Sequence, residues 1–152
     1  MIRSEREYRE ALQRLEQDRE VARLQREALA AHPLAPDEVE RAMEPLLSFQ
    51  AQLAEEIDWY ESVRRRSFPA LRRLTQIGRL LVALRIADGL SQRELAERLG
   101  VSESAVSRDE RNEYHGITIE RAQRVLDALG ASLTTAVEDS RLVTEPELVG
   151  AA

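Results

Sequence analysis

The sequence contains no cysteine, no lysine and few aromatic residues, and it has no long apolar run. Without cysteine, the chain can form neither disulfide bonds nor thiolate metal sites. Because no stretch of 18 apolar residues and no basic-then-apolar leader is present, we expect a cytoplasmic protein with neither a membrane span nor a signal peptide. Aromatic residues make up 4% and charged residues 33% of the chain, which is typical of long solvated helices around an aliphatic core.

Patterns of catalysis and cofactor binding are also missing. The chain has two histidines but no glycine-rich phosphate loop, HExxH motif or nucleophile elbow. Ser107, Asp109 and His115 come nearest to a hydrolytic set, but Ser107 and Asp109 are two residues apart on a predicted helix and face different directions. We therefore expect no enzymatic activity, no catalytic residue, no metal site and no cofactor.

The net charge of −6 is unevenly distributed. Residues 1–67 contain 11 arginines and 15 acidic residues, residues 68–138 contain 10 of each, and residues 139–152 contain one arginine and three acids. The acidity therefore lies outside 68–138. A neutral segment can still bind nucleic acid if its arginines gather on one face, because binding follows the local field.

The first third of the chain predicts two helices joined by a short turn. Residues 3–31 read as an amphipathic helix, with Ser4 as N-cap and Glu7 completing a capping box. The turn HPLAPD, at 32–37, ends in Asp37, which we predict to be the N-cap of the second helix.

The second helix carries a heptad seam, in which one member is polar: Val39, Met43, Leu46, Gln50, Leu53, Ile57 and Tyr60. Pro45 interrupts this run and predicts a kink, or a restart near Glu44. The seam could close an antiparallel hairpin with the first helix or pair with another chain. We expect Trp59 and Tyr60 to cap a core rather than to stack on bases.

A linker with three arginines follows at Arg64–Pro69 and leads into a helix over 70–87. These arginines are either solvated or in contact with phosphate. The stretch LSQRELAERLGVSESAVSRDER then begins at Leu90. Ser91 and Glu94 form a capping box, Gly100 suits a left-handed turn, and Ser102 caps a further helix that ends near Asn112. Two short helices joined around a glycine are a helix-turn-helix unit.

A helix that enters the major groove of DNA needs small or polar residues outside and apolar support behind. Ala105 and Val106 supply the support. We predict that Gln92, at the first turn of the preceding helix, donates to a phosphate. The other predicted DNA contacts lie on or just after the second helix: Ser102, Glu103, Ser104, Ser107, Arg108, Arg111, Asn112, Tyr114 and His115.

The chain after this unit predicts one more helix, over 119–129, capped by Thr118 and stopped by Gly130. Alternation in ASLTTAV predicts a short strand over 131–137. We expect a flexible tail over 139–152.

The stretch LSQRELAERLGVSESAVSR, which begins at Leu90, resembles the Xre, or Cro and phage-repressor, class of helix-turn-helix regulators. The matching residues are Gln92, Leu95, Ala96, Gly100, Val101, Ser102, Val106 and Ser107. The resemblance covers about 70–138 and implies a compact five-helix DNA-binding domain, usually a homodimer on an inverted repeat. HigA-type antitoxins share this domain, often followed by a strand.

Two positions depart from the family. Many members have glutamine at the position of Glu103, and glutamate cannot pair bidentately with adenine and repels phosphate. Most members have an apolar residue at the position of Asp109, which by helical spacing lies near the inward side. Because a buried unpaired carboxylate would cost several kcal/mol, we expect Asp109 to pair with a nearby arginine or to lie at a solvated edge.

These observations predict an all-α protein: a helical hairpin over 1–66, a lambda-repressor-like helix-turn-helix domain over 67–138, and a tail. We expect a dimeric repressor that binds double-stranded DNA through Glu103–Asn112. One alternative is an antitoxin that neutralises a toxin through 1–66 and represses its own operon. Another is a helical adaptor that no longer binds DNA.

Overall fold

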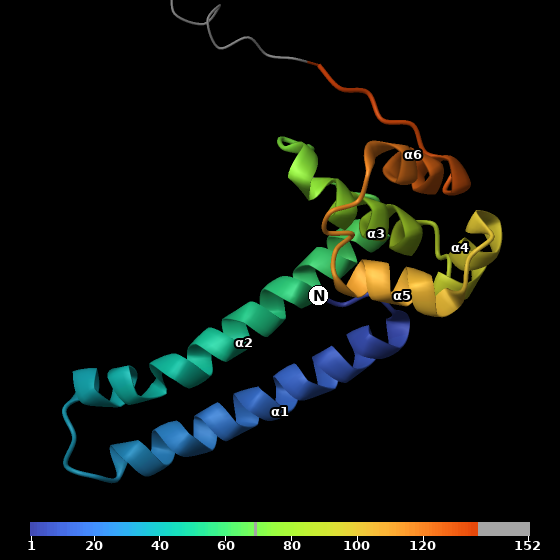
Figure 1. Ribbon diagram of the computed structural model, residues 1–152. Coiled ribbons are helices and arrows are strands. Elements are labelled where there is room, and N and C mark those ends of the chain that lie inside the picture. The colour runs from blue at the N-terminus through green and yellow to red at the C-terminus, as the bar shows by residue number, and fades with distance from the viewer. Residues whose placement is uncertain (69, 137–152) are drawn as a thin grey trace, which may run out of the picture.

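The computed structural model describes residues 1–68 and 70–136. Within them the chain is all-helical, with six α-helices and one 3-10 turn (Figure 1). In order they are α1 (Glu5–Ala30), α2 (Pro36–Arg64), η1 (Leu74–Gln76), α3 (Ile77–Ala87), α4 (Gln92–Leu99), α5 (Glu103–Arg111) and α6 (Ile119–Ala128). The all-α prediction is confirmed.

The strand predicted over 131–137 is wrong for residues 131–136, which form no regular element. A strand needs a partner for its backbone N–H and C=O groups, and the described residues offer none. Residue 137 and the predicted tail lie outside the described residues. Residues 70–136 contain four α-helices preceded by η1, where the family resemblance implied five helices.

Local capping decides where α1 and α2 begin. Ser4 caps α1 as predicted, because its Oγ accepts from the Glu7 N–H at 3.2 Å. The Glu7 carboxylate, however, accepts from the Arg3 N–H at 2.7 Å, so only half of the capping box forms. The N-cap of α2 is Ala35 rather than Asp37. Pro36 fits the first helical position, where no N–H is needed, and this moves the helix start two residues earlier.

Pro45 does not restart α2, which continues unbroken from Pro36 to Arg64. A proline inside a helix costs roughly 3 kcal/mol. Packing on both sides of Pro45 opposes this cost: Met43 is fully buried against Ala22 and Val39, and Leu46 packs against the same cluster.

The heptad seam of α2 packs on α1, so the predicted antiparallel hairpin is confirmed. Val39, Met43, Ile57 and Tyr60 are buried. The one polar member, Gln50, donates its Nε2–H to the Asp18 carbonyl at 2.7 Å. Within the chain the seam is therefore occupied by α1.

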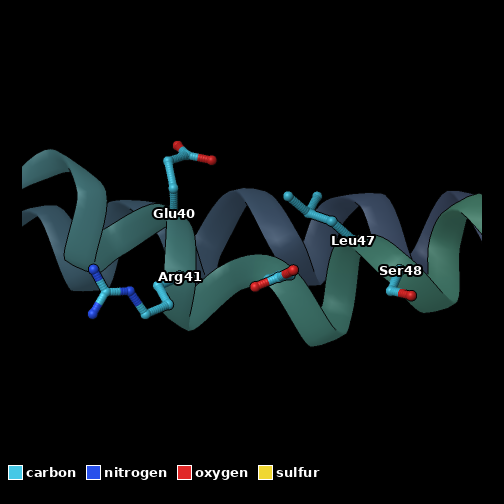
Figure 2. A pocket seen from close by; sticks show the side chains of 5 residues that line it. Glu40, Arg41, Leu47 and Ser48 are labelled. Carbon is cyan, nitrogen blue, oxygen red and sulfur yellow. The ribbon is translucent and has the colours of Figure 1, made fainter.

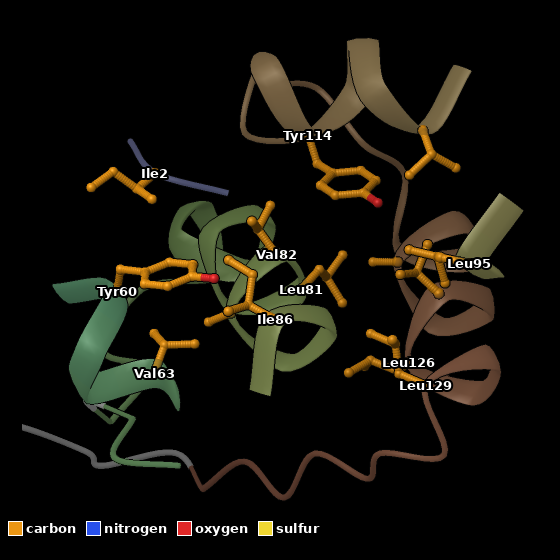
Figure 3. Packing of buried hydrophobic residues seen from close by; sticks show 14 of the residues in the cluster. Ile2, Tyr60, Val63, Leu81, Val82, Ile86, Leu95, Tyr114, Leu126 and Leu129 are labelled. Atoms are coloured by element: carbon orange, nitrogen blue, oxygen red, sulfur yellow. The ribbon is translucent and has the colours of Figure 1, made fainter. Parts of the chain in front are cut away.

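The base of the hairpin and helices α3 to α6 share one hydrophobic core (Figure 3). Leu81, Val82 and Ile86 of α3 lie at its centre. Tyr60 and Val63 approach from α2, and the ring of Tyr60 stacks on Tyr8 with centroids 5.0 Å apart. Arg79 lies over the ring of Trp59, 5.0 Å from its centroid. Trp59 and Tyr60 therefore both pack at this core, as predicted.

Gly78→Ala is expected to lower the free energy of unfolding by about 1–3 kcal/mol. In a helix, alanine normally stabilises the fold relative to glycine by up to about 1 kcal/mol. Here we expect the opposite effect, because the added methyl group would clash with backbone atoms. A Cβ on Gly78 would stand 1.9 Å from the Glu113 carbonyl oxygen and 2.8 Å from its carbon. These are backbone atoms and cannot rotate away. Urea denaturation measures the change in the free energy of unfolding. A variant as stable as the parent would contradict the close packing of α3 on the backbone of Glu113.

Candidate functional site

Helices α4 and α5 form the candidate site, and each is fixed at its start by a serine. Ser91 Oγ accepts from the Glu94 N–H at 3.1 Å, and Glu94 Oε2 accepts from the Ser91 N–H at 2.7 Å. This backbone hydrogen bond lowers the pKa of Glu94. Gly100 ends α4 with a φ of +66°, in the left-handed region. Ser102 Oγ then accepts from the Ala105 N–H at 3.2 Å to cap α5.

The outer side of α5 is open. Glu103, Ser104, Arg108 and Arg111 are exposed, and Ser107 is partly exposed. Behind them Val106 is 1% exposed, and Leu95 of α4 is fully buried. The helix is thus anchored on one side and accessible on the other. Its ends carry further exposed polar groups: Ser102 at the start, and Asn112 and His115 after the last turn.

Both acidic residues in the last turn of α5 are paired with arginines of neighbouring helices. Asp109 pairs with Arg121 of α6, which confirms the expectation that it finds an arginine. Glu110 is fully buried and pairs with Arg85 of α3, at 2.5 Å from Oε1 to Nε and 2.7 Å from Oε2 to Nη2. Arg108 and Arg111, in contrast, form no ion pair with any described residue. The charge that α5 presents outward is therefore mainly positive.

Sequence reasoning missed the buried pair Arg85–Glu110. The signal for it was periodicity: Glu110 lies four residues after the inward Val106, and Arg85 four residues after the inward Leu81. Arg85 also donates to the Leu90 carbonyl at 2.6 Å and to the Arg3 carbonyl at 3.0 Å. One side chain thus joins the N-terminal segment, the α3–α4 turn and α5.

Gln92 belongs to the same network. Its Nε2 donates to Glu110 Oε2 at 2.8 Å, and the side chain is partly buried. The network holds Gln92 at the first turn of α4, beside α5. That Gln92 also contacts a phosphate stays a prediction.

Tyr114, predicted as a DNA contact, is instead a core residue. It is 6% exposed and packs in the cluster around Leu81 (Figure 3). Glu113 and Tyr114 both adopt left-handed conformations, with φ of 47° and 52°, and this turns the chain back so that the ring points inward. The loop sequence gave no sign of this turn, which needs two non-glycine residues in a rarely used region.

Tyr114→Phe is expected to change the free energy of unfolding at neutral pH by less than about 1 kcal/mol. The Tyr114 hydroxyl is buried and has no hydrogen-bond partner among the described residues. Burial, with the negative charge of Glu110, raises the pKa of Tyr114 above its usual 10.0.

The stabilisation linked to that raised pKa is complete below about pH 10 and is lost as pH rises, because the unfolded chain gives up the phenol proton first. Phenylalanine has no such proton. Stability of Tyr114→Phe should therefore fall less steeply above pH 10 than stability of the parent, in denaturation curves recorded at several pH values. Identical slopes would contradict the burial of this hydroxyl.

The linker arginines are engaged within the chain. Arg64 pairs with Glu5, Arg65 lies 3.7 Å from Glu61, and Arg66 lies 2.6 Å from Asp88. These pairs favour the solvated-linker interpretation over phosphate contact.

The described residues contain no group of three histidine, cysteine or acidic side chains that could hold a metal ion. One surface hollow is lined by residues of α2 alone: Glu40, Arg41, Glu44, Leu47 and Ser48. The labelled side chains around it diverge (Figure 2). None of the described helices has a stretch long and apolar enough to cross a membrane.

Comparison with known families identifies the second part of the chain. Residues 81–135 match the family model HTH_3, helix-turn-helix. They run from the middle of α3 past the end of α6 and include all of α4 and α5. No curated protein and no solved structure matches the chain.

Proposed function

From the match of residues 81–135 to a helix-turn-helix family model, we propose that the chain is a sequence-specific repressor of the Xre/Cro type that binds an operator as a dimer. The proposed reading element is α5. A dimer would place two copies of α5 about 34 Å apart, in successive major grooves on one side of the duplex. Occupation of a promoter in this way excludes the transcription machinery.

One observation carries the proposal: in the last turn of α5 both acidic side chains are paired with arginines of other helices, whereas its own arginines stay exposed. Asp109 and Glu110 are paired with Arg121 and Arg85, so they do not oppose a phosphate backbone. Arg108 and Arg111 remain exposed beside Ser104, a small residue that lets the helix approach base edges closely. Glu103 alone keeps an exposed carboxylate at the start of α5, where the helix dipole favours it.

A salt titration tests this proposal. Binding of the full chain to a fluorescent duplex is measured by anisotropy from about 50 mM salt upward, and log K is plotted against log salt concentration. We expect a linear decrease whose slope reports the number of phosphates contacted. No binding at the lowest salt would contradict the proposal and would favour a helical adaptor without DNA.

A second candidate function is that of an antitoxin, which represses its operon and also binds a toxin through the hairpin. The charge of the hairpin favours it: residues 1–67 carry 15 acidic residues against 11 arginines, which suits a basic partner. Co-expression with the product of the adjacent reading frame tests it. Relief of growth arrest by the full chain, together with its co-purification with that product, would support the antitoxin over the simple repressor.

A further inference from the structure

The two sides of the α1–α2 hairpin differ in how far their large apolar residues are exposed to solvent. Two antiparallel helices are related by a two-fold axis normal to their common plane. Residues that immediately precede inward-facing positions therefore lie on one side of the hairpin in both helices, and residues that immediately follow lie on the other. The inward positions are known from burial and from the Gln50–Asp18 hydrogen bond.

The side formed by the preceding residues carries the most exposed large apolar residues of α1 and α2, although Gln17, Glu38 and Gln52 on the same side are polar. Val21, Ala28, Ala42 and Phe49 precede the inward residues Ala22, Leu29, Met43 and Gln50. Leu24 lies beside them, three residues after Val21 and four before Ala28. We call these five exposed residues the apolar stripe. Phe49 is 70% exposed, and Val21 and Leu24 are each 51% exposed.

The opposite side of the hairpin carries more charged residues, together with two less exposed leucines, Leu12 and Leu47. The residues that follow Asp18, Ala22, Val39 and Met43 are Arg19, Arg23, Glu40 and Glu44. Figure 2 shows Glu40 pointing away from α2 toward this side, and Glu40 is exposed. A hairpin that served only as a solvated arm would need no such difference, because large exposed apolar residues gathered on one side mark an interaction surface.

We propose that the apolar stripe is the surface on which two copies of this chain dimerise, with their hairpins side by side in a parallel four-helix bundle. In this arrangement α1 of one copy lies over α2 of the other. Phe49 then packs against the second copy near Val21, because the Gln50–Asp18 bond sets these two positions within one helical turn of each other.

Charges at the base of the stripe favour this partner and this orientation. Arg14 and Glu56 precede the inward Leu15 and Ile57, so they flank the stripe on the same side and at nearly the same level. Within the chain Arg14 reaches Asp18 only at 3.9 Å, and Glu56 contacts the Met1 amine at 3.1 Å. Parallel packing brings Arg14 of each copy to Glu56 of the other, whereas antiparallel packing stacks Arg14 on α1 of the second copy.

The inference deepens the proposed function and rests on it in one respect: parallel hairpins keep both helix-turn-helix domains at one end, as binding to one operator requires. The dimer itself can be tested without DNA. If the chain forms the dimer but does not bind DNA, the proposed repressor function is contradicted and the proposed dimer surface is supported.

Sedimentation velocity of the full chain tests the surface. We expect a dimer at micromolar concentration, and for Val21→Glu/Phe49→Glu a dissociation constant raised about 100-fold or more, because charges would be buried in an apolar contact. The matched control is Leu12→Glu/Leu47→Glu, which places two glutamates on residues that are 40% and 37% exposed on the opposite side. The control should remain dimeric. A monomeric parent, or equal effects of the two variants, would overturn the proposal.

Cross-linking tests the orientation in chains that keep the rest of the stripe. The protein has no cysteine, so single cysteines introduced as Val21→Cys and Phe49→Cys are unique. On mixing and oxidation, the parallel bundle predicts that the mixed disulfide dimer exceeds either homodimer. Predominance of homodimers, or no cross-link, would contradict the arrangement.

Discussion

Replacing Glu110 with leucine is expected to lower the free energy of unfolding by about 3–5 kcal/mol, the largest effect of any substitution considered for this protein. The carboxylate is fully buried and holds both Nε and Nη2 of Arg85, which is itself 3% exposed. Removal of the carboxylate leaves a guanidinium without its counter-charge inside the core. Because Glu110 lies on α5, the loss should also loosen the proposed reading helix.

Two companion variants separate the charge from the shape of the side chain. Arg85→Met/Glu110→Leu removes both charges, so it should regain a large part of the stability lost in the single variant. Glu110→Gln keeps hydrogen-bonding atoms in place and should fall between the parent and Glu110→Leu. All are compared by urea denaturation with a common slope. A loss below about 1 kcal/mol in Glu110→Leu would show that this pair does not hold α3 to α5.

Arg108→Ala is expected to weaken operator binding by about 1–3 kcal/mol, a loss of roughly 5- to 150-fold in affinity, if the arginine pairs with a guanine edge. Arg108 is exposed at the centre of the outer side of α5 and has no ion pair among the described residues. Its guanidinium is therefore available without breaking an internal contact.

Two controls show what kind of contact Arg108 makes: a random duplex beside the operator, and an alanine substitution at a second exposed arginine. Loss on the operator but not on a random duplex identifies a base contact, and equal loss on both identifies a phosphate contact. Arg124→Ala removes an exposed arginine on α6 and is the matched control, for which we expect little change. If Arg108→Ala binds the operator as tightly as the parent, Arg108 does not contact DNA.

Local signals in the sequence were enough to place most helices. Ser4, Ser91, Ser102 and Thr118 are N-caps in the structure as predicted, because a side-chain oxygen that satisfies a free backbone N–H needs no information from elsewhere in the chain. Gly100 was predictable for a similar reason, because a left-handed position at the end of a helix favours glycine whatever lies elsewhere in the chain. The hairpin was predictable because its seam repeats at heptad spacing over several turns.

Features that depend on distant partners were not predictable in the same way. Glu110 is acceptable in the core only because Arg85, 25 residues earlier, reaches it. The position of Tyr114 just after α5 in the sequence predicts a DNA contact, whereas a left-handed turn directs its ring into the core. The strand predicted over 131–137 does not form over 131–136, because no described segment lies beside it to accept and donate its backbone hydrogen bonds. In each case the deciding contact comes from another part of the fold.

Selection from a pool of random duplexes tests the central claim most directly, namely that the exposed side of α5 reads DNA. The full chain is mixed with the pool, and bound sequences are recovered and sequenced over several rounds. We predict enrichment of an inverted repeat with half-sites about one helical turn apart, and a changed half-site when Arg108→Ala is used. Recovery of sequences no different from the starting pool would contradict the account.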